Sequence, residues 1–341
     1  MEERELEVSL SKCSTTLFTP WNKQFKCKPL VSIGETTLEV KNNPKILGVV
    51  FDNWLNWGAH STISSQKAAN RVNILKALSG TSWGQQKETL LNSYKAVVRP
   101  VLEYACPAWT PAAAPSSINK LQRVQNSALR VATGCTSMTS IQHLHDECQM
   151  LPVNRHIRLK SVQQQIAHHL PNHPGKRLLG TSKFSRTKQS LMSRYERYVE
   201  ALRDSDSEDE ETISSIERYK TMVKAAHTNE VKDYIETKED NKVLNAPAPE
   251  ISPLEKNLPR ATRRTLAQLR SGYSPFLKTY LNRIGKEEDD LCPDCKEEPH
   301  TTRHIFECSA RPTTLTMLSL WDSPVEAAKF LRLDDSGVAS P

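Results

Sequence analysis

Three cysteines and a histidine near the end of the chain have the spacing of metal ligands. Cys292 and Cys295 are separated by two residues, His304 and Cys308 by three, and the two pairs by eight. Thiols two residues apart suit a tight turn around one ion, and residues four apart share one face of a helical turn. Three thiolates and one imidazole complete a tetrahedral zinc site with no open position, as in structural centres. The pattern therefore predicts a structural zinc ion.

Other features of the cysteine and histidine pattern leave alternatives open. His300 lies four residues before His304 and is a second candidate for the histidine ligand. A group of reduced cysteines beside a helix, without metal, is the other interpretation of the cluster. The remaining cysteines are scattered and form no disulfide framework, which is typical of a reducing compartment. We expect an intracellular protein, cytoplasmic or nuclear.

The first 58 residues are rich in strand signals. Thr15–Thr19 is one candidate strand, and residues 28–40 predict a hairpin that turns at Gly34 and Glu35. Pro44–Asp52 is a short apolar run rich in β-branched residues, which predicts a single buried strand. These strands are expected to form a small antiparallel sheet.

From His60 the apolar period changes from two residues to about 3.6. Five amphipathic segments with short connections predict a helical bundle: Ile63–Leu78, Thr89–Val98, Ser116–Val131, a short helix from Thr139, and Arg155–Leu170.

The later part of the chain changes in composition twice. An acidic run with serines at 205–212 and a proline-rich stretch at 246–253 predict a flexible linker over residues 178–258. A helical apolar face returns over Arg260–Ile284, before the cysteine cluster. We therefore expect an α+β chain of four parts, at residues 1–58, 59–177, 178–258 and 259–341.

The positive charge is concentrated in the middle of the chain. The net charge of the whole chain is +7, but residues 41–177 hold sixteen Lys and Arg against five Asp and Glu. Such a surface suits a polyanion such as nucleic acid. A run of about 18 apolar residues, a signal peptide and a glycine-rich phosphate loop are all missing, so we expect neither a membrane nor a small-molecule substrate as partner.

Several stretches resemble one family, in the right order. They are "LSKCSTTLFTP" from Leu10, "PKILGVVFD" from Pro44, "YKAVVRPVLEYACPAW" from Tyr94, "LQRVQNSALRVATG" from Leu121, and "CPDC…H…C" from Cys292. Together they resemble the C-terminal part of a jockey-like non-LTR retrotransposon reverse transcriptase, an RNA-directed DNA polymerase.

This resemblance implies parts of a right-hand polymerase. Residues 1–58 would be the end of the palm and residues 59–177 the helical thumb, which lies along the primer–template duplex. RNA, DNA or an RNA–DNA hybrid would then be bound without sequence preference, through cations that contact phosphates. The candidate cations are Lys67, Arg71, Lys76, Lys120, Arg123 and Arg130.

The sequence departs from the family at the catalytic centre. The family's carboxylates sit in an [FY]-A-D-D hairpin and in an earlier strand, and neither has a match here. We carry over no catalytic residue, expect a truncated product that is inactive by itself, and expect magnesium only if the missing palm is supplied. The alternative is a non-enzymatic, zinc-dependent module that was derived from the element and binds nucleic acid or protein.

Overall fold

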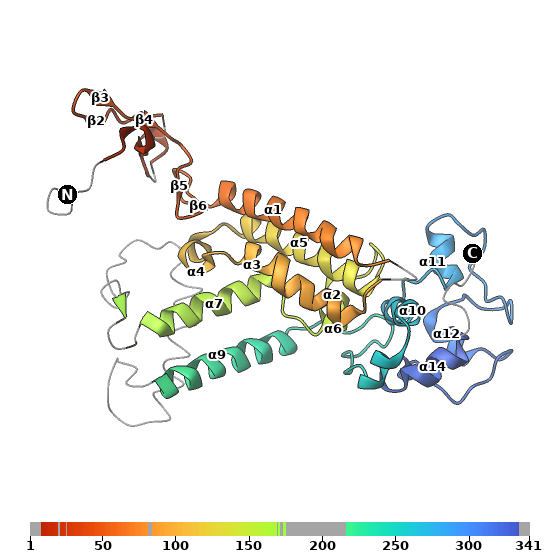
Figure 1. Ribbon diagram of the computed structural model, residues 1–341. Helices are drawn as coiled ribbons and strands as arrows, with labels where there is room; N and C mark the ends of the chain where they lie inside the picture. The colour runs from red at the N-terminus through yellow and green to blue at the C-terminus, as the bar shows by residue number, and fades with distance from the viewer. Residues whose placement is uncertain are drawn as a thin grey trace. The chain divides into compact units, whose positions relative to one another are not determined.

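The computed structural model describes residues 8–333, apart from residues 20, 25, 81–83, 169, 171–172 and 175–215. It combines many helices with short strands, in agreement with the α+β class predicted (Figure 1). None of the described helices is long and apolar enough to cross a membrane. The contacts divide the chain into two compact units: unit 1 comprises Met1–Lys67, Leu102–Gln122 and Asn154–His227, and unit 2 comprises Ala68–Val101, Arg123–Val153 and Thr228–Pro341.

The strands of unit 1 form three separate pairs. β1 (Ser14–Thr15) runs parallel to β4 (Glu39–Val40), while β2 (Ser32–Ile33) and β3 (Thr36–Thr37) form the hairpin predicted around Gly34 (Figure 1). The expectation of one antiparallel sheet is therefore wrong, since three two-stranded pairs take its place and one is parallel. Each of these strands is two residues long, too short to build a continuous face that would align the pairs.

Pro44–Asp52 is itself a hairpin, so the prediction of a single strand here is also wrong. β5 (Lys45–Ile46) pairs with β6 (Val49–Val50) across Leu47 and Gly48, whose φ angles are 46° and 85°. Two consecutive positive φ angles are the mark of a tight type I′ turn. The sequence does not indicate a turn here, because one of its two central residues is the apolar Leu47, which is 89% exposed.

Tyr104 explains why glycine is needed at the second position of the turn. The Tyr104 hydroxyl donates to the Leu47 carbonyl at 2.9 Å, so its ring covers the turn. A Cβ added at Gly48 would lie only 3.0 Å from this ring. Glycine thus provides both the positive φ and the close approach.

An aromatic group fixes the hairpin to the start of α1 (Gly58–Ala77). The Trp57 ring lies between Phe51 and Trp109, with centroids 5.0 and 6.4 Å away. His60 packs edge-on to Trp109 and accepts a hydrogen bond from the Val50 N–H at 3.3 Å. Burial lowers the pKa of His60, which favours the neutral ring that this bond requires.

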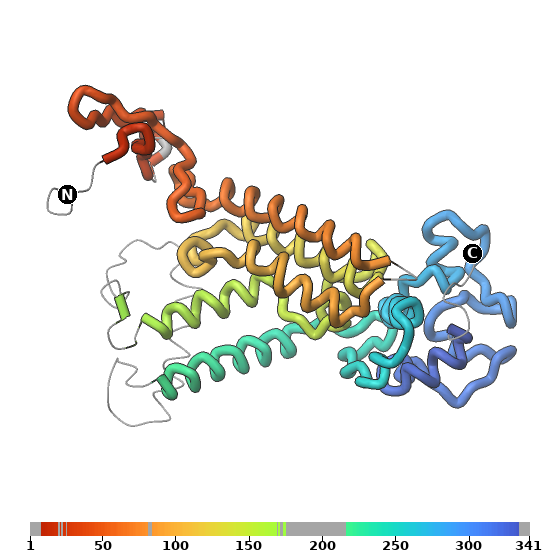
Figure 2. The backbone as a smooth tube through the Cα atoms, viewed as in Figure 1, coloured from red at the N-terminus to blue at the C-terminus, as the bar shows by residue number. Residues whose placement is uncertain are grey.

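Two helices pack together in unit 1 from either side of the undescribed segment. α7 (Val153–His168) contributes Leu159, Val162 and Ile166 to an apolar cluster with Met222 and Ala226 of α9 (Ile216–Glu236), and the two helices run side by side in Figure 2. The first part of the expected linker, residues 178–215, lies outside the described residues. The remaining part of the expected linker contains α9, which packs against α7. This segment is therefore folded and is not a flexible linker.

The other elements match the predicted helices closely. Pro100 lacks an N–H, and the helix that contains it widens into the π turn η4 (Tyr94–Val98) between α2 (Lys87–Ser93) and α3 (Arg99–Leu102). Ser140 caps α6 (Ile141–Cys148) by accepting the His143 N–H at 3.2 Å. The remaining bounds are η2 Leu10–Lys12, η3 Asn22–Gln24, α4 Cys106–Trp109, η5 Thr110–Ala112, α5 Pro115–Thr133, α6 Ile141–Cys148, η7 Pro253–Asn257, α10 Arg260–Ser271, α11 Lys278–Arg283, α12 Thr302–Glu307, α13 Ser319–Asp322 and α14 Pro324–Phe330.

An apolar core joins the C-terminal elements of unit 2. Helix α10 contributes Leu266 and Leu269, α12 contributes Ile305 and Phe306, and α13 contributes Trp321, all of them buried. Because α12 also carries one candidate metal ligand, this core holds the metal-binding region against α10.

A buried ion cluster lies at the centre of unit 2. Arg270 of α10 is fully inaccessible, donates to both carboxylate oxygens of Glu147 at 3.2 Å, and pairs with Glu255 of η7. Lys87 of α2 reaches the same two carboxylates at 2.8 and 3.4 Å. We call the group Lys87, Glu88, Glu147, Glu255, Arg263 and Arg270 the Arg270 cluster.

Arg263 balances the remaining charges of the Arg270 cluster. Its guanidinium binds both oxygens of Glu88, at 2.5 and 2.9 Å, and lies 3.5 Å from Glu255. Three cations therefore face three carboxylates. Burial alone would raise the pKa of Glu147, but Lys87 and Arg270 lower it to about 2. Its charge is thus retained inside the protein.

Arg270→Ala is expected to lower the free energy of unfolding by about 3–5 kcal/mol, because Glu147 and Glu255 would lose one of the two cations they share without regaining water. Urea unfolding followed by circular dichroism measures this. Arg283→Ala is the control, since this exposed guanidinium lies 5.7 Å from the Tyr273 ring, a contact worth only about 0.5–1 kcal/mol. Equal losses for both variants would contradict the role of the cluster.

Acid should weaken unit 2 through Glu147. Its pKa is lowered from 4.5 to about 2 in the folded chain, so its contribution is complete above the unfolded pKa and is lost as the pH falls through this interval. Stability measured from pH 6 to pH 2 should fall less steeply in Glu147→Gln than in the unsubstituted chain. Parallel curves would show that Glu147 does not carry this dependence.

Candidate metal centre

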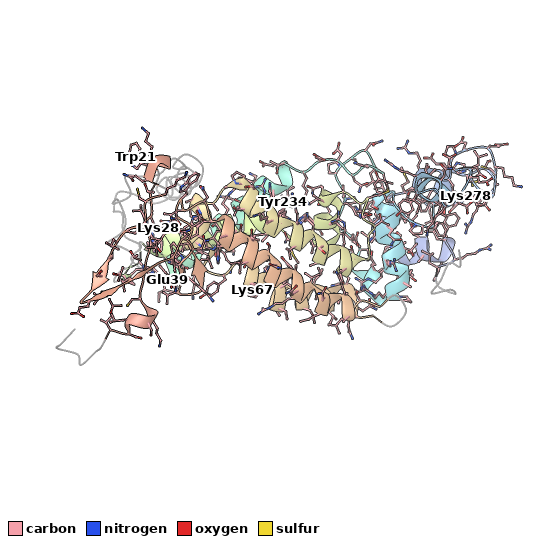
Figure 3. All side chains as sticks on the ribbon, turned by 90° about the horizontal axis from the view of Figure 1, so that it is seen from above. Trp21, Lys28, Glu39, Lys67, Tyr234 and Lys278 are labelled. Carbon is pink, nitrogen blue, oxygen red and sulfur yellow. The ribbon has the colours of Figure 1, made fainter. Side chains whose placement is uncertain are left out.

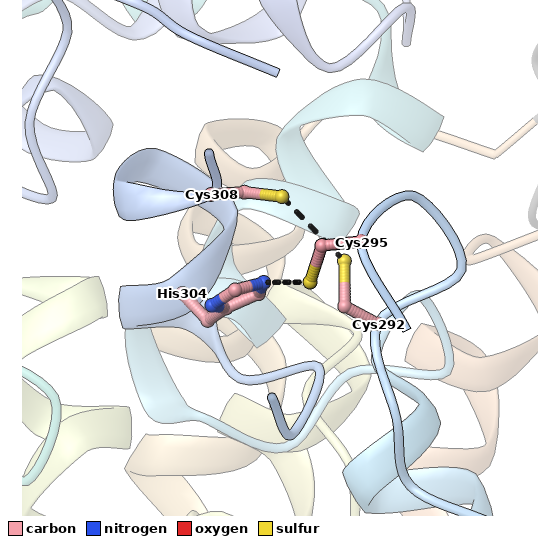
Figure 4. A group of neighbouring side chains, drawn as sticks. All are labelled: Cys292, Cys295, His304 and Cys308. Atoms are coloured by element: carbon pink, nitrogen blue, oxygen red, sulfur yellow. Dashed lines mark hydrogen bonds between the residues drawn. The ribbon is translucent and has the colours of Figure 1, made fainter. Parts of the chain in front are cut away.

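The four predicted metal ligands come together at one point of unit 2. Cys292 and Cys295 lie on a loop closed by the bridge between Leu291 and Pro299, His304 lies on α12, and Cys308 follows the end of that helix (Figure 4). Their ligand atoms all lie within 4.8 Å of one another.

Two of the separations between these atoms match those of a tetrahedral zinc site. Metal–sulfur bonds of about 2.3 Å at tetrahedral angles place two sulfurs about 3.8 Å apart, and a sulfur and a nitrogen about 3.5 Å apart. The Cys292 and Cys308 sulfurs are 3.8 Å apart, and the Cys295 sulfur is 3.3 Å from His304 Nε2. The group can therefore hold a metal ion, and three sulfurs with one nitrogen favour zinc.

The geometry separates the two candidate histidines. His300 is buried, and its Nδ1 accepts the Lys278 N–H at 3.2 Å while its carbonyl accepts the Thr279 hydroxyl at 2.9 Å. His300 therefore joins the loop to α11, where Lys278 is labelled in Figure 3. His304 alone of the two belongs to the ligand group.

Backbone hydrogen bonds shape the cysteine loop. The Cys292 N–H donates to the Glu298 carbonyl at 2.8 Å, and the Lys296 N–H donates to the Cys292 carbonyl at 2.9 Å, with Lys296 at a φ of 60°. Backbone N–H groups of Glu297 and Glu298 lower the pKa of Cys295 to about 7. A thiol with such a pKa is about half thiolate at neutral pH, and the thiolate is the form that binds metal.

Helix α12 is fixed at its start, which sets the position of His304. Thr301 caps the helix by accepting the His304 N–H at 3.1 Å. The Thr302 hydroxyl donates to the Leu269 carbonyl of α10 at 3.0 Å. The ligand helix is thus attached directly to the residue before Arg270.

The predicted phosphate-binding residues differ in what they contact. Lys67 is exposed on α1 of unit 1 (Figure 3), and Lys120 donates to the Thr62 hydroxyl of the same unit at 2.7 Å. In unit 2, Arg71 is exposed and donates to the Val97 carbonyl at 2.8 Å. Lys76 is five residues further along α1, about 140° around the helix from Arg71, so these two lie on different faces.

Two further cations lie on α5 within unit 2. Arg123 is exposed, whereas Arg130 is partly buried and donates to the Thr139 carbonyl at 3.2 Å. Arg130 therefore supports the chain after α5, and Arg123 is the better placed of the two for a phosphate.

Comparison with curated proteins gives two related sequences. The chain is 29% identical over 150 residues to a probable RNA-directed DNA polymerase from transposon X-element of Drosophila melanogaster, which covers 43% of this chain and 16% of the relative. It is 26% identical over 132 residues to the probable RNA-directed DNA polymerase from transposon BS of the same organism, over 39% of this chain and 14% of the relative.

The chain is similar to retrotransposon RNA-directed DNA polymerases. This agrees with the resemblance that the sequence motifs indicate, and it supports a relationship to non-LTR reverse transcriptases. The matched part spans about a sixth of the length of these relatives. No family model matches the chain, and no solved structure matches it.

Exchange of each histidine tests the assignment of ligands. His304→Ala should lose stoichiometric zinc, because only three ligands remain. His300→Ala should keep about one equivalent, because His300 contacts backbone groups and no ligand atom. Metal analysis of the purified full chain measures both, and equal zinc in the two variants would contradict the assignment.

Proposed function

We propose that this chain is a nucleic-acid-binding part of a retrotransposon reverse transcriptase, with a C-terminal module folded around structural zinc. The similarity to two transposon RNA-directed DNA polymerases carries the nucleic-acid part of the proposal. The gathering of the ligand atoms of Cys292, Cys295, His304 and Cys308 within 4.8 Å of one another supports the zinc part. Zinc binding would stabilise the loop and α12, because the ligation free energy adds to that of folding.

In this proposal, the helices within residues 59–177 form the thumb and contact the backbone of RNA, DNA or a hybrid duplex. The cations of each unit would contact phosphates: the exposed Lys67 and the half-buried Lys120 in unit 1, and the exposed Arg71, Lys76 and Arg123 in unit 2. Binding would be independent of sequence, since contacts to phosphates carry no base information. Arg130 would contribute less than the exposed cations, because it is partly buried and its guanidinium also donates to the Thr139 carbonyl.

The charge around the cysteine loop argues against a contact between this loop and nucleic acid. It favours a purely structural role for the zinc ion. Residues 287–298 hold seven carboxylates and one lysine. Zinc with three thiolates would add a further negative charge, so phosphates would be repelled here. This observation supports the second candidate function for the C-terminal module alone, which is interaction with a protein.

The proposal assigns no chemistry of polymerisation to this chain. The [FY]-A-D-D hairpin has no match among its 341 residues. Two-metal transfer needs carboxylates at the primer end, so we assign neither a catalytic residue nor a magnesium site here.

Salt dependence of binding tests the nucleic-acid part. The affinity of the full chain for a short RNA–DNA hybrid, measured by fluorescence anisotropy, should fall linearly on a double-logarithmic plot against salt. Exchange of both Lys67 and Lys120 for glutamine should reduce the slope by about two, close to one unit for each phosphate contact.

The matched control for this experiment exchanges both Lys286 and Lys329 for glutamine, which removes two exposed charges that are not candidate phosphate contacts and should leave the slope unchanged. A salt-independent affinity, a strong preference for one sequence, or the same loss in the control would contradict the proposed interface.

A further inference from the structure

One carboxylic residue contacts three of the four candidate ligands. The Glu298 Oε2 atom lies 3.0 Å from His304 Nδ1. The Glu298 carbonyl accepts the Cys292 N–H at 2.8 Å, and its own backbone N–H hydrogen-bonds to the Cys295 sulfur. Glu298 is not a ligand itself, because its carboxylate faces the far side of the imidazole ring.

The contact with His304 decides which ring nitrogen is free to bind metal. A neutral imidazole carries its proton on one nitrogen and a lone pair on the other. A carboxylate 3.0 Å from Nδ1 holds the proton there, and the lone pair then resides on Nε2. Nε2 is the atom that lies 3.3 Å from the Cys295 sulfur, inside the ligand group.

We propose that Glu298 is a positioning residue of the metal centre, which selects the Nε2 tautomer of His304 and strengthens zinc binding. This inference rests on the proposed zinc site. Carboxylates that orient a ligating histidine raise its basicity, and their loss typically weakens metal binding about 10- to 100-fold. The Glu298 side chain is 71% exposed, so placing its carboxylate against His304 costs little desolvation.

The neighbouring glutamate provides a matched control. Glu297 precedes Glu298 on the same exposed loop and carries the same charge. Both residues offer backbone N–H groups to Cys295, and these groups remain when the side chains are exchanged. Only Glu298 places its carboxylate against His304, so the two variants differ in that contact and share the loss of one negative charge.

The experiment measures the zinc affinity of the full chain by competition with a chromophoric chelator. Glu298→Ala should bind zinc about 10- to 100-fold more weakly than the unsubstituted chain. Glu298→Gln should fall between the two, since its amide oxygen can still accept the Nδ1 proton. Glu297→Ala should match the unsubstituted chain.

Two further measurements separate positioning from a general effect on folding. Cobalt(II) in place of zinc should give absorption bands typical of tetrahedral thiolate ligation, and these bands should shift in Glu298→Ala but not in Glu297→Ala. The urea stability of the metal-free chain should be the same for Glu298→Ala as for the unsubstituted chain.

Each outcome has one meaning. If the unsubstituted chain binds no stoichiometric zinc, the proposed zinc site itself fails. If it binds zinc and the two alanine variants have equal affinity, the zinc site stands and the role of Glu298 is overturned. A loss of stability in metal-free Glu298→Ala that accounts for its weaker affinity would likewise overturn the inference.

Discussion

A guanidinium with no access to water controls the arrangement of unit 2. Arg270 cannot be left unpaired at this depth, because an uncompensated buried charge costs several kcal/mol. Glu147 on α6 and Glu255 on η7 must therefore approach it from different parts of the chain, and Lys87 must follow to compensate the second carboxylate. The position of α10 against α2 and α6 is the result. Apolar packing alone would tolerate small shifts of α10, but directed ion pairs do not.

The geometry of the metal centre depends on this position of α10. Thr302, two residues before the ligand His304, is bonded to the Leu269 carbonyl, and Leu269 adjoins Arg270. Ile305 and Phe306 of the ligand helix belong to the same apolar core as Leu266. The metal then has to organise only the cysteine loop. Glu298 and His300 already connect this loop to His304 and to α11. Metal binding and the Arg270 cluster consequently stabilise a shared element, and each should make the other easier to form.

Local patterns in the sequence predict the ligands and most helices, because their information lies within a few residues. Ser140 predicts the start of α6, and the spacing from Cys292 to Cys308 predicts the ligand group. The hairpin at Leu47 and Gly48 escapes prediction because a leucine occupies a turn position that usually carries a polar residue. The choice between His300 and His304 needs three-dimensional contacts. The sequence gives one indication that Arg270 is buried. It follows Leu266 by four residues and so interrupts an apolar helical face.

The distance along the chain between Glu147 and Arg270 has a consequence for synthesis of the protein. The two residues are 123 positions apart, and a ribosome adding about 5–20 residues per second needs about 6–25 s to cover that distance. Until Arg270 has been added, Glu147 lacks the guanidinium that pairs with it in the folded chain. Helices as short as α2 and α6 are marginal in water by themselves, so we expect this part of unit 2 to close only after α10 has been synthesised.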